Sequence, residues 1–307
     1  MSELSLRGII PASILPMDHH HNIDEDSLRM YIQWLTKNRV AGIAVNVDTG
    51  EGPHLDREER IRVLQIYRDE IGGKVPIIAG MSAQFTAKAI ELASDAKREG
   101  ADALLVFPIS AFAGEPLSPE VPYAYHKAIA DAVDLPIILF QLQRDLGGVE
   151  FSEECLHRLI EIQEVVAIKE ASFNAKRFVD TLRAVRSGPR RIIMLTGNDT
   201  FILESLILGA DGALIGFGTL VTDQQIEMYE AVQRGDYKTA KEIDERIKPL
   251  IDVVFAPPVR NYRARIKEAL AMLDVINVPH IRPPLTPVSK DEKKAIRKAL
   301  KQLDLLK

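Results

Sequence analysis

One lysine lies inside a segment that otherwise has the pattern of a buried β-strand. Residues 165–172 read Val-Val-Ala-Ile-Lys-Glu-Ala-Ser, an apolar and β-branched run that is typical of a parallel sheet. Burial of an unpartnered ammonium group costs several kcal/mol, so Lys169 either bends toward water, pairs with Glu170 or has a chemical role. In the last case, desolvation lowers the pKa of the amine, and the neutral amine can attack a carbonyl carbon and form a Schiff base.

The lysine segment is one of eight similar apolar segments. They occupy residues 8–17, 42–47, 75–79, 101–107, 135–141, 165–172, 191–195 and 212–216. Each has the length of a strand, and a helical pattern follows each of them. After the first segment, for example, Leu28, Ile32 and Leu35 recur at helical spacing. Strand and helix therefore alternate along the chain.

Capping residues mark the expected starts of several helices. Asp56 and Glu59 form a capping-box pattern before the helix that follows the second strand. Thr86 is the expected N-cap of the next helix. Near the end of the repeating pattern, Thr222 and Gln225 are expected to form a second capping box.

The alternation of eight strands with eight helices predicts an α/β fold of the TIM-barrel class, a (β/α)₈ barrel. A doubly wound open sheet is the alternative, but no G-x-G-x-x-G motif follows the first strand. Beyond residue 234 the strands stop and the pattern becomes helical, with segments separated by prolines that include Pro249. We therefore expect a barrel over residues 1–234 and a C-terminal helical extension over residues 235–307.

Composition and charge restrict the class of partner. The net charge of −5 at pH 7 and the lack of a basic block argue against nucleic acid or an anionic membrane. Cys155 is the only cysteine, so no internal disulfide can form, and no zinc-site spacing is present. The sequence contains neither a signal-peptide pattern nor an apolar run that could span a bilayer. We expect a cytoplasmic protein with a small-molecule ligand and without a metal or cofactor.

In a (β/α)₈ barrel the active site lies at the C-terminal ends of the strands, so the residues that close or follow the strands are candidates. They form a polar set: Asp48, Thr49, Ser110, Gln141, Gln143, Arg144, Lys169, Asn198 and Asp199. Residues 212–218 are glycine-rich, which allows a ligand to approach the backbone closely. At such a barrel mouth the Schiff-base role becomes the favoured interpretation of Lys169.

Several motifs occur in the order in which a known family carries them. They are Leu-Pro-Met at residues 15–17, Asp-Thr-Gly-Glu at 48–51, Val-Pro-Ile-Ile-Ala-Gly at 75–80, Ile-Lys-Glu-Ala at 168–171, Thr-Gly-Asn-Asp at 196–199 and Gly-Ala-Leu-Ile-Gly at 212–216. On these motifs the chain resembles the dihydrodipicolinate synthase / N-acetylneuraminate lyase family of class I aldolases over nearly its whole length. Each motif is weak alone, but their common order is specific.

The resemblance implies a reaction type and a set of binding residues. Lys169 would form an imine with pyruvate or another 2-keto acid, and Thr49 with nearby backbone N–H groups would hold the carboxylate of that acid. The expected substrate-binding residues are Thr49, Gly50, Ser110, Phe140, Gln141, Gly212 and Ile215. Members of the family are commonly homotetramers, so we expect a homo-oligomer, either a tetramer or a dimer.

Four positions depart from the pattern of the family. The tyrosine that usually ends the fifth strand corresponds to Phe140, which cannot carry a proton. Asp48 replaces the first threonine or serine of the G-T/S-T-G-E turn, and Ser110 stands where synthases have a tyrosine. The synthase arginine after the fifth strand has no clean counterpart, although Arg144 lies one position away. We therefore expect the chain not to be a dihydrodipicolinate synthase.

Asp48 is the candidate for the lost acid–base role, and we assign it as catalytic together with Lys169. An aspartate near an imine can shuttle protons if burial raises its pKa. The alternative is that Asp48 only hydrogen-bonds the backbone of a tight turn. Phe140 either contacts the substrate or is a core residue at a strand end. Glu51 and Glu170 are expected to fix loop geometry.

The sequence thus predicts a class I lyase in which the imine accepts electrons while a C–C bond is cleaved or formed. A dehydratase of a 2-keto-3-deoxy sugar acid is one alternative, because some family branches with that activity also diverge at the tyrosine position. A catalytically silent keto-acid binding protein is another, although such a site has no reason to bury an amine. A barrel enzyme that acts on phosphate esters is a third, since glycines of residues 212–218 could bind phosphate.

Overall fold

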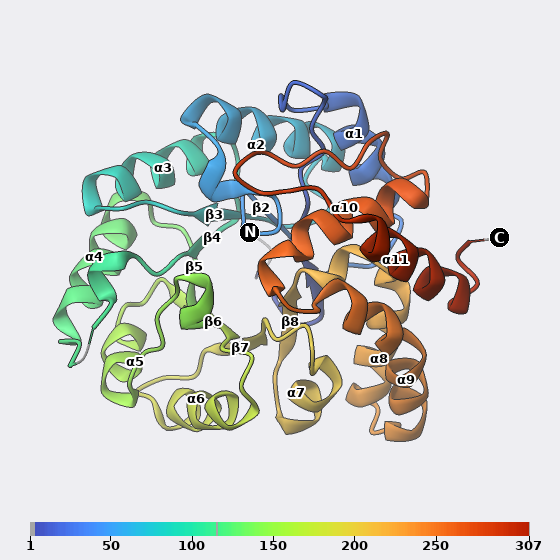
Figure 1. The fold of residues 1–307 in the computed structure, drawn as a ribbon. Helices are drawn as coiled ribbons and strands as arrows, with labels where there is room; N and C mark the ends of the chain where they lie inside the picture. The colour runs from blue at the N-terminus through green and yellow to red at the C-terminus, as the bar shows by residue number, and fades with distance from the viewer. Residues whose placement is uncertain (1–3, 115, 307) are drawn as a thin grey trace.

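The computed structural model describes residues 4–114 and 116–306, and in this part of the chain eight parallel strands alternate with helices (Figure 1). The strands are β1 (Ile9–Pro11), β2 (Ile43–Val45), β3 (Ile77–Met81), β4 (Ala103–Val106), β5 (Ile137–Leu142), β6 (Val165–Ala171), β7 (Ile193–Thr196) and β8 (Gly212–Ile215). Their order is β1-β8-β7-β6-β5-β4-β3-β2. An isolated parallel bridge between Ala12 and Ala44 joins the two ends of this sheet. The predicted (β/α)₈ barrel is therefore confirmed.

Helices surround the strands. They are α1 (Glu25–Leu35), α2 (Arg57–Ile71), α3 (Thr86–Arg98), α4 (Glu120–Val133), α5 (Glu153–Ile160), α6 (Ala175–Ser187), α7 (Ile202–Leu208) and α8 (Thr222–Gln233). The C-terminal part adds α9 (Tyr237–Val254), α10 (Tyr262–Met272) and α11 (Lys290–Gln302), and α9 lies beside α8 (Figure 1). Among the described residues, no helix has both the length and the apolar character that crossing a membrane requires.

Some helices begin where the local capping residues predict. At others, the predicted capping residue has a different role in the structure. The capping box of α2 is present. The Asp56 side chain accepts a hydrogen bond from the Glu59 backbone N–H at 2.8 Å, and the Glu59 side chain accepts a hydrogen bond from the Asp56 backbone N–H at 3.0 Å. Thr86 is the first residue of α3 and not its N-cap. Gln225 forms no capping box, because its amide donates to two carbonyl oxygens of the loop after β8. Pro249 lies inside α9, whose apolar face is buried.

The alternation of side chains along the strands divides the core into two parts. Ile78 and Ile138 belong to an apolar cluster inside the barrel, whereas Ile168 belongs to the cluster between the strands and the helices. Successive side chains of a strand point to opposite faces of the sheet. On β6, Lys169 therefore points into the barrel and Glu170 points toward the surrounding helices.

The C-terminal extension is attached to the barrel by buried charges. Lys267 of α10 is fully buried and pairs with Glu51, which follows β2 and is also fully buried. The Lys267 Nζ also donates to the carbonyl oxygen of His280 at 2.8 Å. The second carboxylate oxygen of Glu51 accepts the backbone N–H of Arg282 at 2.8 Å, and the Arg282 guanidinium pairs with Glu59. These contacts hold α10 against the turn after β2, at the end of the barrel where the candidate residues lie.

Candidate active site

A cavity lies at the C-terminal ends of the strands. Its lining comes from several strand ends and from the extension: Ala12, Val47, Asp48, Thr49, Phe140, Leu142, Leu146, Lys169, Ala171, Phe173, Gly197, Asp199, Gly216, Phe255, Val259 and Tyr262. The space between these side chains, including its opening to solvent, is about 430 Å³. Small-molecule sites commonly have volumes of about 300–1,000 Å³, so the cavity suits a small ligand.

Lys169 is the nucleophile that this cavity offers. The side chain is only 7% exposed, and its Nζ lies 4.4 Å from the centre of the Phe140 ring. Burial lowers the pKa of the amine from 10.5 to about 8, while the carboxylates of Asp199 and Asp48 act in the opposite direction. About a tenth of the lysine is therefore neutral at pH 7, which is the form that attacks a carbonyl carbon.

A glycine after β7 leaves room for the lysine chain. A Cβ atom on Gly197 would lie 2.6 Å from Cε of Lys169 and 2.9 Å from Cβ of Ala171. Both distances are far shorter than a normal contact between carbon atoms of about 3.5–4.0 Å. Gly197 therefore allows Lys169 to extend along the cavity wall.

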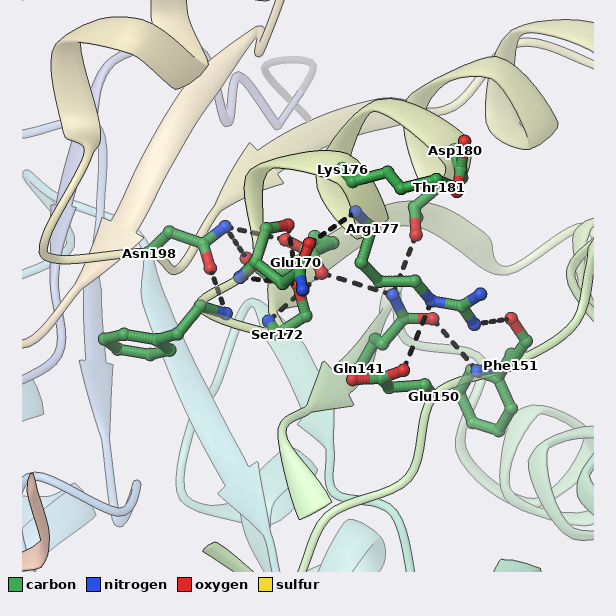
Figure 2. Close-up of polar contacts among 12 residues, drawn as sticks. Gln141, Glu150, Phe151, Glu170, Ser172, Lys176, Arg177, Asp180, Thr181 and Asn198 are labelled. Carbon is green, nitrogen blue, oxygen red and sulfur yellow. Dashed lines mark hydrogen bonds and ion pairs between the residues drawn. The ribbon is translucent and has the colours of Figure 1, made fainter. Parts of the chain in front are cut away.

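A buried polar network behind the strands fixes the end of β6 (Figure 2). Glu170 accepts hydrogen bonds from the Asn198 amide at 2.6 Å, from the Gln141 amide at 3.2 Å and from the Ser172 backbone N–H at 3.0 Å. The Gln141 amide also donates to the hydroxyl of Thr181 in α6 at 2.8 Å. Burial raises the pKa of Glu170. The network joins the ends of β5, β6 and β7 and thereby positions Lys169 on the opposite face of β6.

Asp199 places a second titratable group beside the lysine. It is 5% exposed, and its Oδ1 accepts the backbone N–H of Phe217 at 2.7 Å. Burial raises the pKa of Asp199 to about 7, while this hydrogen bond and the charge of Lys169 act in the opposite direction. The amine and the carboxyl thus both titrate close to neutral pH, as the acid and base groups of an active site do.

Asp48 is joined to the C-terminal extension rather than to its own turn. Its Oδ2 accepts a hydrogen bond from the Tyr262 hydroxyl at 2.8 Å, and its Oδ1 forms an ion pair with Arg263. Arg263 also donates from Nε to the main-chain oxygen of Asp48 at 2.7 Å. The turn itself is closed by main-chain hydrogen bonds to Val47. The Asp48 carboxylate therefore lies at the cavity wall, between the turn after β2 and α10.

Three of the expected substrate-binding residues do not line the cavity. Gln141 points away from the cavity, because on β5 the neighbouring Phe140 occupies the inward position. Ile215 packs between the strands and the helices for the same reason. Gly212 is the first residue of β8, so it lies at the opposite end of the barrel, where its Cα approaches the backbone of Gly8.

Two further expected residues do not line the cavity either. Gly50 is buried in the turn after β2, where a Cβ atom would come within 2.8 Å of the Ser13 carbonyl oxygen. Ser110 is exposed and lies beside a separate pocket that Arg144 also lines. Of the residues expected from the sequence, the cavity thus brings together Asp48, Thr49, Phe140, Lys169 and Asp199.

Tyr262 is the cavity residue that sequence reasoning missed. It belongs to the segment after residue 234, which the sequence pattern describes only as helical. Its aromatic ring at the start of a helix looks like an ordinary packing residue, and nothing in its spacing relates it to Asp48. Only the docking of α10 on the turn after β2 brings these two residues together.

The comparison with known families decides the identity of this fold and site. A model of the dihydrodipicolinate synthetase family matches residues 5–303. The chain belongs to this family. Its members are lyases of the class I aldolase type that use a Schiff-base lysine.

Individual relatives agree with this assignment. A 4-hydroxy-tetrahydrodipicolinate synthase of Rhodopseudomonas palustris is 32% identical over 98% of this chain and 98% of the relative, and that of Methanopyrus kandleri is 32% identical over 98% and 97%. Among solved structures, a dihydrodipicolinate synthase from Acinetobacter baumannii complexed with pyruvate is 30% identical, with a TM-score of 0.87 over 98% of this chain and 100% of that one. The family relationship thus extends over nearly the whole chain.

Proposed function

We propose that this family member is a Schiff-base-forming class I lyase that acts on pyruvate or another 2-keto acid by aldolase-type cleavage or condensation. The observation that carries the proposal is Lys169, a buried amine with a pKa of about 8 inside a cavity at the barrel mouth. A protein that only bound a keto acid would have no need for the unfavourable burial of this amine.

The groups around Lys169 support the steps of imine formation. The neutral amine attacks the C2 carbonyl carbon, water leaves, and the resulting iminium group withdraws electrons from C3. Asp199, whose charge interacts with that of Lys169, stabilises the positive nitrogen. Thr49 lines the cavity, and in this proposal its hydroxyl binds the substrate carboxylate.

We further propose that the reaction differs from that of the synthases named above. Phe140 lies against the Lys169 amine and packs edge-on against Phe107 with ring centres 4.9 Å apart. This ring has no proton to transfer, so the strand cannot supply the phenol that the synthase pattern has there. The proposal includes a homo-oligomeric state, either a tetramer or a dimer, in the cytoplasm.

Borohydride reduction in the presence of pyruvate and a panel of other 2-keto acids is expected to attach the acid covalently to Lys169. The measurement is intact-protein mass spectrometry followed by peptide mapping, with the Lys169→Arg variant as the control that should stay unlabelled. Analysis of the products then separates C–C cleavage from dehydration. If folded wild-type protein gave no adduct with any acid, Lys169 would not be an imine-forming residue, and a binding protein would become the better interpretation.

The Asp199→Asn variant is expected to form the imine at lower pH than the wild type. In the wild type, the neutral fraction of Lys169 and hence the trapping rate rise about tenfold per pH unit below the pKa of about 8. The Asp199 carboxylate raises this pKa, so its replacement by an uncharged amide lowers the pKa and moves the rise in trapping rate to lower pH. The Asn side-chain oxygen can still accept the Phe217 N–H.

The trapping rate measured against pH in both proteins tests this shift. Asp131→Asn, which changes an exposed aspartate of α4, is the control and should leave the profile in place. An unchanged profile in Asp199→Asn, or one displaced to higher pH, would contradict the assigned interaction.

A further inference from the structure

The cavity contains a tyrosine that comes from the C-terminal extension and not from the barrel. Tyr262 is the first residue of α10 and is 6% exposed. Its ring stacks on Phe255, with centres 5.3 Å apart and an angle of 17° between the planes. A Cβ atom on Gly216 would lie 3.2 Å from Cε2 of Tyr262, so the glycine after β8 leaves space for the ring. The phenol is therefore held in a defined position beside the cavity.

The Tyr262 hydroxyl is connected to one carboxylate. Its Oη donates to Oδ2 of Asp48 at 2.8 Å and lies 3.3 Å from Oγ1 of Thr49. Arg263 pairs with the other oxygen of the Asp48 carboxylate and keeps this side chain in place. Because the phenol hydrogen points to Asp48, the Thr49 hydroxyl is the donor in the 3.3 Å contact, and one lone pair of Oη is left to accept a proton from a molecule in the cavity.

We propose that Tyr262 and Asp48 form the proton relay of this site, with Tyr262 in contact with the substrate and Asp48 as the group that stores the proton. This inference rests on the proposed imine chemistry and assigns its proton transfers to named residues. The extension thereby supplies the phenol that β5 lacks, since Phe140 occupies the strand position beside Lys169.

Protons and electrons are conserved in the cleavage reaction, and condensation is its reverse. In cleavage, the C4 hydroxyl proton of the bound imine passes to Oη of Tyr262, and the phenol proton passes to Asp48. The C3–C4 bond breaks, its electron pair forms a C2=C3 double bond, and the electrons of the C=N bond return to the Lys169 nitrogen. An aldehyde and an enamine result. Asp48 then returns its proton through Tyr262 to C3 of the enamine, which gives the imine of the shorter keto acid.

The surroundings favour a relay over a free phenolate. Burial and the Asp48 carboxylate raise the pKa of Tyr262 well above its usual value, so a phenolate does not accumulate. In the relay, the phenol accepts one proton while it releases another, and no negative oxygen forms beside Asp48. The rival proton-transfer group in the cavity is Asp199, but its Oδ1 is engaged by the Phe217 N–H and its charge acts on Lys169.

The test uses pyruvate alone as the probe. In D₂O, reversible conversion of the pyruvate imine to its enamine replaces the methyl hydrogens by deuterium, which proton NMR follows directly. We expect Tyr262→Phe to slow this exchange about 100-fold, the lower range for loss of a general acid–base group. Borohydride trapping on Lys169 should reach the wild-type level at the same pyruvate concentration. Asp48→Asn should also slow the exchange, at least about tenfold, because an amide cannot store the proton.

Tyr229→Phe is the matched control, because Tyr229 lies on α8 and its hydroxyl donates to the main-chain oxygen of Asp211 at 3.2 Å. This variant should exchange at the wild-type rate. A Tyr262→Phe exchange rate within about threefold of the wild type overturns the relay and leaves Asp199 as the proton-transfer group. Loss of both trapping and exchange in folded Tyr262→Phe also overturns it, since Tyr262 would then position Lys169. If Tyr262→Phe does not fold, trapping and exchange are measured on Asp48→Asn instead. Slowed exchange with retained trapping then supports the relay, and exchange at the wild-type rate overturns it.

These outcomes are distinct from a failure of the proposed function itself. If the wild type is not labelled on Lys169 by borohydride and pyruvate, imine chemistry is absent and no relay is needed. If the wild type is labelled and exchanges the methyl hydrogens of pyruvate, imine chemistry is established, and the two variants then test the relay alone.

Discussion

Replacement of Lys169 by methionine is expected to abolish turnover and, at the same time, to stabilise the folded protein. Methionine keeps an unbranched chain of similar length but has no amine, so no imine can form. Loss of a nucleophile on which the whole reaction depends lowers kcat by roughly 10⁴-fold or more. The inward position of the residue on β6 and its burial leave no neighbouring amine in the cavity lining to replace it.

The gain in stability follows from the pKa of the lysine. A pKa lowered from 10.5 to about 8 means that the folded state disfavours the charged amine by about 3 kcal/mol relative to the unfolded chain. This cost is fully present below pH 8, shrinks as the pH rises from 8 to 10.5, and vanishes only above pH 10.5, where the amine is neutral in both states. This figure already includes the opposing effect of the Asp199 and Asp48 carboxylates. We expect up to about 3 kcal/mol of added stability at pH 7.

Urea unfolding at pH 7 and at a pH near 10 measures this effect, and the gain should be smaller at the higher pH. Lys176→Met is the matched control, because Lys176 lies on α6 with 85% of its side chain exposed and pairs only at the surface with Asp180. A Lys169→Met variant that lost both activity and stability would indicate that the lysine has a structural role.

Replacement of the other buried lysine, Lys267, by methionine is expected to have the opposite effect on stability. Lys267 and Glu51 are both fully buried and form an ion pair between α10 and the turn after β2. The variant leaves the Glu51 carboxylate buried without its cation, and removal of one partner of such a pair typically costs about 3–5 kcal/mol. The hydrogen bond to the His280 carbonyl is lost as well. We expect a loss of about 4 kcal/mol in the free energy of unfolding.

A double-mutant cycle with Glu51→Gln tests the pair. In the double variant both buried charges are removed together. Its loss of unfolding free energy should therefore be smaller than the sum of the two single losses by more than about 1 kcal/mol, within the coupling range of about 0.5–3 kcal/mol for residues in contact. Lys294→Met, at an exposed position of α11, is the control and should change the unfolding free energy by no more than about 0.5 kcal/mol. Additive single effects, or a Lys267→Met variant as stable as the wild type, would contradict the role of the pair.

The two lysines show that burial alone does not distinguish a reactive lysine from a structural one. Both have a pKa that burial lowers. Lys267 makes a direct ion pair and a hydrogen bond to a carbonyl, so its protons are engaged by fixed partners. Lys169 instead lies against the Phe140 ring and lines a cavity, with Asp199 and Asp48 acting on it as charges. The identity of the partners therefore separates the two roles.

The features that the sequence determined are those that depend on neighbours along the chain. The alternation of apolar segments with helical patterns predicted the barrel, because a strand or a helix that buries one face needs a fixed period of apolar residues. The capping box of Asp56 and Glu59 could be predicted for the same reason, since its partners lie three residues apart. The lysine inside the apolar run of β6 drew attention to Lys169, but only its place at the predicted barrel mouth favoured a chemical role, because an ion pair also explains a buried charge.

Only the tertiary structure decided which side chains share the cavity. A shift of one residue along a strand reverses the face to which a side chain points, so Phe140 lines the cavity while Gln141 joins the network behind β5. The hydrogen bond between Asp48 and Tyr262 joins residues 214 positions apart, and it forms because the buried pair of Glu51 and Lys267 docks α10 on the barrel. Contacts of this kind depend on how whole elements pack, and no local period in a single sequence specifies them.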